Sequence, residues 1–269
     1  MKTTFALAGL TLALCSLLPA QDSGRVVVPA RNSSRPRKVN VHVMNGAITV
    51  KAYTGKEVIV ESDASTRRTP RRGAVTTPDG LHRIDIPLRG LTVEEEDNQI
   101  TVRMPDSGGS LTLNVPADTS LDLHSMSGAV NVEGVKGEIV VDTMNGRIAL
   151  NNVSGNVLAH SQNGQINVAM DTVDTAKPLS FTTMNGTIDV TLPANYKGNV
   201  KMSSNHGAIY TDFEFKLGGG VITQSNNTSE GKFKVQIGND RALSGTINGG
   251  GPEATFKSFN GSIYIRKKK

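Results

Sequence analysis

Residues 125–142 read SMSGAVNVEGVKGEIVVD, residues 143–160 read TMNGRIALNNVSGNVLAH, and SQNGQINV follows from Ser161. Glycine recurs every nine residues along this stretch, and alternate glycines share the same neighbours, so the repeating unit is about 18 residues long. A fixed period of this length is typical of proteins in which each unit packs on the next one.

The opening phrase of this unit recurs outside the central stretch. TMNGTIDV begins at Thr183, SNHGAIYT begins at Ser204, and outlying copies read MNGAITV from Met44 and FNGSIYI from Phe259. The phrase therefore occurs seven times in 269 residues, and we interpret it as one local structure used repeatedly.

Apolar residues alternate with polar ones after each repeat glycine, as in Val130 and Val132 or Ile148 and Leu150. This period of two indicates a half-buried β-strand. Strands so short cannot bury their apolar faces alone, but stacking the units ~4.8 Å apart buries them in continuous columns. We therefore predict an all-β fold, a β-solenoid of short Gly-punctuated strands with two strands per rung of about 18 residues. One buried column should contain Val130, Ile148, Ile166, Ile188 and Ile209 on consecutive rungs.

A hairpin meander is the competing architecture, because Asn-Gly pairs also favour two-residue hairpins. A meander does not require the glycines to keep the same phase every 18 residues, and here the phase is kept. This observation favours the solenoid.

The turns between strands are the structural positions that the repeat defines. Glycine there supplies positive φ angles, and asparagines stacked in register can hydrogen-bond to one another along the column. The turn residues are Gly46, Gly128, Gly146, Gly164, Gly186, Gly207, Gly261, Asn145, Asn163 and Asn185.

The chain begins with the features of a secretory signal. Lys2 precedes an apolar run, FALAGLTLALCSLL, and small residues before Gln21 offer a cleavage site, so we expect residues 1–20 to be a signal peptide. The bulky Leu14 before Cys15 argues against lipid attachment, and cleavage after Ala20 removes the single cysteine of the chain. Disulfides and thiolate metal sites are then excluded in the mature protein. No later run is long and apolar enough for a transmembrane segment.

The rest of the chain reads as one domain. We expect a linker over residues 21–36 and a single β-solenoid repeat domain over residues 37–269. Residues 61–110 interrupt the repeat, and we interpret them as an irregular insertion that contains a few longer strands. Residues 266–269 form a basic tail.

Basic residues are concentrated in two places although the whole chain has a modest net charge of +5. Arg67, Arg68, Arg71 and Arg72 lie within RRTPRR in the insertion, and RKKK ends the chain. An export signal makes nucleic acid an unsuitable partner, so anionic envelope polymers, surface glycans or another envelope protein are the expected partners. The alternative is that both basic segments are only solvated surface.

Several phrases carry a family resemblance, above all LTLNVPADTSLDLHSMSGAVNVEGVKGEIVVDTMNGRIAL, TMNGTIDVTLP and GGGPEATFKSFNGSIYI. Together with MNGAITV they resemble the bacterial family named "putative adhesin", a domain of unknown function with β-strand repeats, over roughly residues 37–268. The resemblance implies an exported envelope β-solenoid in the periplasm, outer envelope or extracellular space. The family has no established catalytic residues, so none is assigned here.

Two outward columns are candidate sites. His124, Asp142 and His160 share one position of successive units and could bind a divalent metal, but a fourth ligand is missing, so a solvated face is the simpler interpretation. Met126, Met144 and Met184 form an apolar strip that either packs under the insertion or binds a partner.

We predict a non-enzymatic, adhesin-like binding or structural protein with no cofactor and no metal. The alternative is a carbohydrate-active β-solenoid enzyme acting on an envelope or extracellular polysaccharide, which would need paired carboxylates on one face. The outward columns of the repeat contain small and amide side chains instead.

Overall fold

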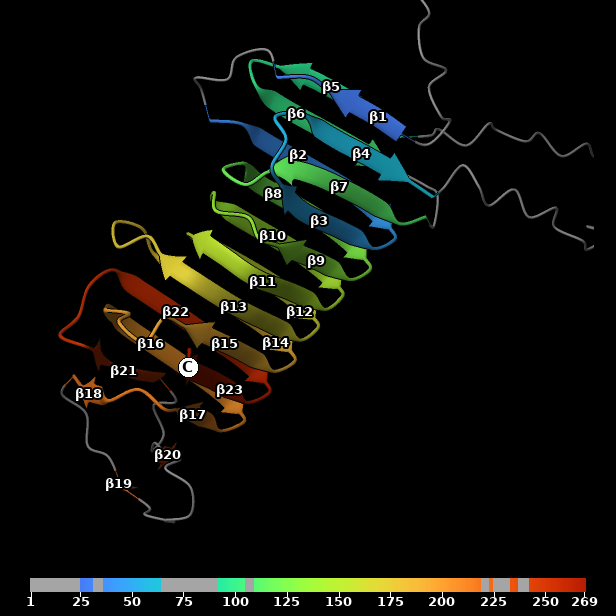
Figure 1. The fold of residues 1–269 in the computed structure, drawn as a ribbon. Coiled ribbons are helices and arrows are strands. Elements are labelled where there is room, and N and C mark those ends of the chain that lie inside the picture. The colour runs from blue at the N-terminus through green and yellow to red at the C-terminus, as the bar shows by residue number, and fades with distance from the viewer. Residues whose placement is uncertain are drawn as a thin grey trace, which may run out of the picture.

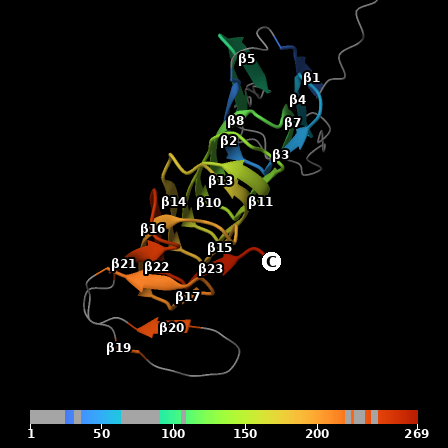
Figure 2. The same ribbon diagram turned by 60° about the vertical axis from the view of Figure 1, so that its left-hand side comes forward.

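The computed structural model describes residues 25–30, 36–63, 91–104, 109–218, 223–224, 233–236 and 242–269. All regular secondary structure in these residues is β-strand, and the strands form two large mixed sheets that lie face to face (Figures 1 and 2). The prediction of an all-β fold is therefore confirmed.

Within the described residues, sheet A contains 12 strands, which follow one another across the sheet as β1 (Arg25–Val28), β4 (Val58–Ser62), β7 (Leu111–Pro116), β3 (Ile48–Tyr53), β9 (Val130–Glu133), β11 (Ile148–Gly155), β13 (Ile166–Val173), β15 (Ile188–Leu192), β23 (Ile263–Lys267), β17 (Ile209–Thr211), β20 (Phe233–Gln236) and β19 (Thr223–Gln224).

Sheet B contains 11 strands in the same part of the chain, in the order β5 (Thr92–Glu96), β6 (Gln99–Met104), β2 (Lys38–Asn45), β8 (Ser120–Ser127), β10 (Ile139–Asn145), β12 (Val157–Asn163), β14 (Leu179–Asn185), β22 (Glu253–Asn260), β16 (Gly198–His206), β21 (Ala242–Ile247) and β18 (Phe215–Leu217).

Each repeat phrase contributes one strand to each sheet. The chain runs along a strand of sheet B, turns at the repeat glycine and continues in sheet A, as in β8–β9, β10–β11, β12–β13 and β14–β15. Neighbouring copies pair in parallel, with Ile139 opposite Val157 in sheet B and Ile148 opposite Ile166 in sheet A. The result is a solenoid-like stack whose apolar core lies between the two sheets.

The order of the rungs differs from the order of the chain at the C-terminal end. Ile188 pairs with Ile263 of β23, and Ile263 in turn pairs with Ile209. The predicted column is therefore wrong at its last step, because the C-terminal copy FNGSIYI is inserted between two earlier copies. In Figure 1 the red strands β22 and β23 accordingly lie among yellow and orange ones.

The order of the rungs also differs from the order of the chain at the N-terminal end of the stack. Ile48, from the first copy, pairs on one side with Val130 and on the other side with Leu111, which comes later in the chain. The first and the last copies of the phrase are thus both held between two neighbouring rungs.

Antiparallel strands close both ends of the described stack. β1 pairs with β4 and β4 with β7, while β21 pairs with β16 and β18 with β21. The segment over 21–36 that was expected to be a linker therefore contains strand β1, whose sequence RVVV is too short to show an alternating pattern. β5 and β6 of the predicted insertion belong to sheet B.

The repeat glycines are needed mainly because adjacent rungs approach closely. A Cβ atom at Gly146 would overlap the carbonyl oxygen of Gly128, and one at Gly164 would overlap that of Gly146. Positive φ angles occur at Gly46, Gly128 and Gly261. At the other predicted turn glycines φ lies outside the positive range, so the positive-φ explanation holds only in part.

Candidate functional site

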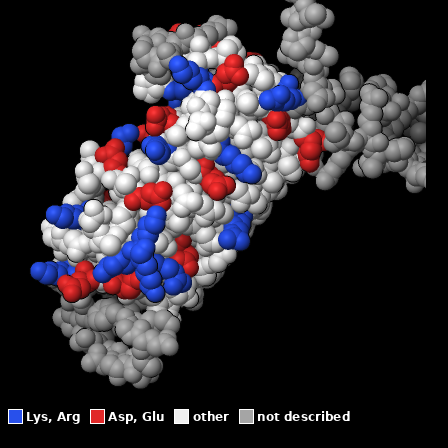
Figure 3. Space-filling view, viewed as in Figure 1, with Lys and Arg blue, Asp and Glu red and all other residues white. Residues whose placement is uncertain are grey.

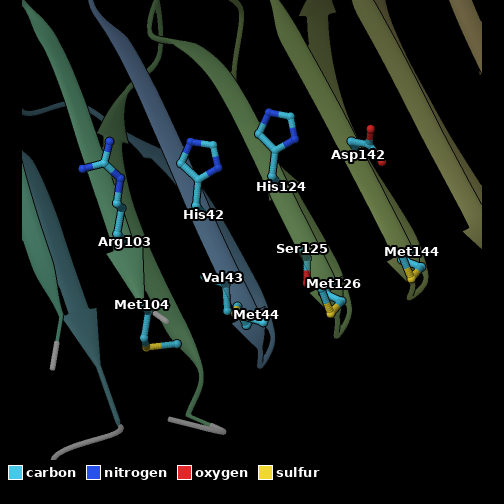
Figure 4. A pocket seen from close by; sticks show the side chains of 10 residues that line it. All are labelled: His42, Val43, Met44, Arg103, Met104, His124, Ser125, Met126, Asp142 and Met144. Carbon is cyan, nitrogen blue, oxygen red and sulfur yellow. The ribbon is translucent and has the colours of Figure 1, made fainter. Parts of the chain in front are cut away.

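A groove of about 400 Å³ lies on the outer face of sheet B, across strands β6, β2, β8 and β10 (Figure 4). Its outward-facing side chains are Arg103, His42, Met44, His124, Met126, Asp142 and Met144.

Strand alternation and register place the polar side chains of this groove side by side on neighbouring strands. His124 lies opposite Asp142, and Asp142 opposite His160, so the predicted register of that column is confirmed. On the other side His124 lies opposite His42, which lies opposite Arg103. Sequence analysis missed His42, although HVMNG at residues 42–46 matches HSMSG at residues 124–128.

The two histidines stack face to face. Their ring centroids are 5.0 Å apart and their planes differ by 7°. Burial lowers the pKa of His42, and the nearby charges of His124 and Arg103 lower it further, whereas Asp122 opposes them.

Asp122 lies beside the second ring of this stack. His124 Nε2 lies 2.8 Å from Asp122 Oδ1, and Lys38 Nζ lies 3.0 Å from Asp122 Oδ2. Partial burial alone would raise the pKa of Asp122, but the hydrogen bond and charge of Lys38, together with His124, lower it overall. The Asp122 carboxylate therefore stays ionised between the Lys38 ammonium and the His124 ring.

A row of exposed apolar side chains runs along the lower part of the groove and beyond it. We call this row the methionine row; its members expose 41–49% of their surface and are Met44, Met126, Met144, Met184 and Phe259. The flanking residues of each strand pair in register, so neighbouring members stand one strand apart, except that Met144 and Met184 stand two strands apart. The polar Gln162 of β12 occupies the position between Met144 and Met184. The structure thus extends the predicted strip by Met44 and Phe259.

An amide ladder borders the methionine row at the turns. Asn163 Nδ2 donates to Asn145 Oδ1 at 2.9 Å, Asn185 donates to Asn163 at 2.7 Å, and Asn260 donates to Asn185 at 2.7 Å. The methionine row therefore lies between a hydrogen-bonded column of amides and the column that contains the histidines.

A second hollow, of about 750 Å³, lies beside the C-terminus. Tyr210 and Tyr264 stack there with ring centroids 4.9 Å apart, and the Arg266 guanidinium lies 5.4 Å from the Tyr264 ring centroid. Arg266 also binds both oxygens of Asp189, at 2.8 and 3.0 Å. This hollow is therefore walled by side chains that already bind one another.

The predicted basic tail is largely engaged in contacts of this kind. Residues 266–267 belong to β23, and Lys268 Nζ lies 2.6 Å from Asp171 Oδ1. Figure 3 shows red side chains interspersed with the blue ones on this face. Half of the tail's positive charge is thus neutralised by Asp189 and Asp171. The predicted loop site of Arg67, Arg68, Arg71 and Arg72 lies outside the described residues.

In the described ranges, no three His, Cys, Asp or Glu side chains gather as a metal site. Over the same ranges the chain forms no helix long and apolar enough to span a bilayer.

Comparison with known proteins gives two matches. A family model described as Toastrack DUF4097 matches residues 26–240. A crystal structure of a "putative cell adhesion protein" from Clostridium sporogenes ATCC 15579 aligns with a TM-score of 0.32 and 10% sequence identity, over 91% of this chain and 99% of that chain. No curated protein matches the sequence.

Proposed function

The chain belongs to the Toastrack DUF4097 family, and from this premise we propose that it is a non-enzymatic binding protein of the bacterial envelope. The observation that carries the proposal is the methionine row, five large apolar side chains that are 41–49% exposed at equivalent positions of sheet B. Large exposed apolar side chains gathered on one face with polar borders are typical of interaction sites. In this row Gln162 is the one polar side chain between the first and the last member.

The form of the row suits an amphipathic helix of another envelope protein. From Met44 to Phe259 the row crosses β2, β8, β10, β12, β14 and β22, which at ~4.8 Å per strand is about 24 Å. An α-helix of about 16 residues has this length and can present a narrow apolar stripe between polar flanks. Methionine side chains are flexible enough to fit such a stripe without rigid complementarity.

The carboxylates argue against the glycosidase alternative. A glycosidase needs two neighbouring carboxyl groups, one of them with a raised pKa. Asp122 and Glu253 both have a lowered pKa, in Glu253 chiefly through a hydrogen bond from Lys201. Asp189 and Asp171 are paired with Arg266 and Lys268. These four carboxylates are therefore each paired with a cation and not with one another.

Export is part of the proposal and rests on the N-terminal sequence. The signal-like residues 1–20 should be removed after Ala20, so that the mature protein begins at Gln21. Mass spectrometry of protein from the envelope fraction tests this; an intact Met1 or a lipid on Cys15 would contradict it.

Docking can be tested by site-specific crosslinking in the producing cell. The photoreactive residue p-benzoylphenylalanine is placed at Met126 in the methionine row or, as a control, at Lys51, which is exposed on the outer face of sheet A. We expect one discrete adduct from position 126 and none from position 51. The crosslinked peptide of the partner should come from an amphipathic helix.

A second substitution shows whether the row itself binds. Met184→Glu, two strands beyond Met144, should abolish the adduct at position 126 because it places a charge in the apolar contact. An adduct that persists in Met184→Glu, equal adducts on both faces, or no adduct at either position would each contradict the proposed function.

A further inference from the structure

We propose that two His-x-Met pairs on adjacent strands, His42 with Met44 and His124 with Met126, form a binding site for a soft monovalent metal ion, Cu(I) or Ag(I). This site is independent of the proposed docking function, although both use methionines of the same row.

Strand geometry places the four donors around one small area. Residues two apart on a strand face the same side about 6.6 Å apart, and adjacent strands are ~4.8 Å apart. His42 lies opposite His124, and the flanking pairs Val43–Ser125 and Asn45–Ser127 keep the two methionines in step. Figure 4 shows both imidazoles and both thioethers on one face of the groove.

The methionines are free to move onto an ion between the strands. Met44 is 41% exposed and Met126 is 44% exposed, and a methionine side chain has three rotatable bonds. The two imidazoles lie side by side, with their centroids 5.0 Å apart and their planes nearly parallel. The lone pairs lie in the ring planes, so one imidazole would have to turn together with the thioethers to bring sulfur and nitrogen within reach of one ion.

The donor types select the ion. Thioether sulfur is a soft ligand that favours Cu(I), and imidazole also binds copper. Divalent ions that prefer oxygen find a single carboxylate, Asp142, among the side chains that line this groove. A soft monovalent cation therefore fits these donors better than Ca²⁺ or Mg²⁺ does.

Asp122 prepares His124 for such a role. The ionised carboxylate oxygen Oδ1 lies 2.8 Å from His124 Nε2, which favours the tautomer that has its hydrogen on that nitrogen and leaves the Nδ1 lone pair for an ion. Metal-binding histidines commonly have a carboxylate beside their second ring nitrogen.

The chain contains its own matched control. Met184 occupies the same position of the repeat and is 49% exposed, but the residue two positions before it is Thr182 and not histidine. Met184 therefore tests whether exposed methionine alone suffices or whether the neighbouring imidazole is required.

The experiment is a titration of protein labelled with ¹³C-methyl methionine, using AgNO₃ as a probe that needs no reductant. We expect saturation at one ion per chain, with shifts of the Met44 and Met126 methyl signals and an unchanged Met184 signal. Equal shifts of all exposed methionines, or no saturation, would overturn the proposal.

Variants then distinguish the loss of a metal ligand from a change elsewhere on the same surface. Affinity for Cu(I) is measured in competition with bathocuproine disulfonate. Asp122→Asn removes a carboxylate that contacts a ligand but not the ion, so it should lower the affinity about 10–100-fold. Met44→Leu/Met126→Leu removes two ligands and should lower the affinity by more than this. Met184→Leu should bind Cu(I) as the wild type does. Wild-type affinity for Cu(I) in the double methionine variant would overturn the proposed metal site. If Met184→Glu loses the crosslinked adduct but keeps wild-type affinity for Cu(I), the result concerns the docking function alone.

Discussion

At the scale of single residues, the turn glycines show how closely the rungs approach. Gly128, Gly146, Gly164 and Gly186 form a column in which each Cα faces the carbonyl oxygen of the preceding glycine. A hydroxyl three residues before such a glycine often donates to the same oxygen, as Ser161 does to Gly146 at 3.2 Å and Thr183 to Gly164 at 3.0 Å. The column has no room for a methyl group because the opposing atoms are backbone.

Gly146→Ala should therefore destabilise the protein through steric overlap. We expect a loss of about 1–3 kcal/mol in the free energy of unfolding, because overpacking at a backbone contact cannot be relieved by a change of rotamer. Urea unfolding measures the loss. Gly218→Ala is the control, since the nearest atom to a new Cβ there is Ser244 O at 3.7 Å; its effect should stay within about 0.5 kcal/mol. Equal midpoints for the two variants would refute the steric explanation.

His42 should make stability depend on pH. Burial, together with the charges of His124 and Arg103, lowers its pKa below the usual 6.5, with Asp122 opposing. The unfolded chain then binds the proton more readily than the fold, so stability is retained above pH 6.5 and falls as the pH drops through 6.5 towards the lower, folded pKa.

Calorimetry across this pH range checks the sign. His42→Gln should flatten the decrease in Tm below pH 6.5, whereas His160→Gln, an exposed position two strands from His124 in the same column, should leave it unchanged. A steeper decrease in the His42 variant would show that the shift has the opposite direction.

At the scale of elements, strands and turns follow directly from the repeat, because each phrase contains its own alternation and its own glycine. The pairing of the strands is less evident, since parallel copies with the same pattern can pair in any order. His42 was missed for this reason: its copy lies 82 residues before His124 in the chain but on the adjacent strand of the sheet. The methionine row was predicted at three of its five positions because those three belong to the continuous central repeats.

The amide ladder gives a test at this scale. Asn163 both donates to Asn145 and accepts from Asn185, so Asn163→Ala breaks two hydrogen bonds between three rungs. At about 0.5–1.5 kcal/mol each, with surface exposure favouring the lower values, the loss should be about 1–2 kcal/mol. Thermal unfolding measures it, with Ser127→Ala on the same column but outside the ladder as the control. A ladder that contributes nothing would give the two variants the same Tm.

At the scale of the whole molecule, the order of the rungs differs from the order of the chain, so the first and the last copies of the repeat both lie inside the stack. β22 lies between β14 and β16, and β23 lies between β15 and β17. Phe256 of β22 is fully buried and stacks on Phe181 with centroids 5.2 Å apart, while Ile263 and Ile265 of β23 are buried between the sheets. The last residues of the chain are therefore an internal layer of the core.

Deleting residues 253–269 should consequently abolish cooperative folding. The deletion removes three buried large side chains, each worth about 2–5 kcal/mol by truncation, against a total stability of about 5–15 kcal/mol for typical proteins. It also leaves β14 and β16 without a parallel partner on one side. The measurements are circular dichroism during heating and amide hydrogen exchange.

Two controls distinguish an internal rung from an ordinary terminus. Removing residues 25–30 deletes only β1, which pairs with β4 at the edge of sheet A, so a cooperative transition should remain. Phe256→Ala should cost about 3–5 kcal/mol, whereas Phe259→Ala, at an exposed position of the same strand, should cost far less. A cooperative transition near the wild-type Tm after deletion of 253–269 would mean that β16 can close directly on β14. The stack would then be stable in the order of the chain, and insertion of the C-terminal copy would not be what holds the fold together.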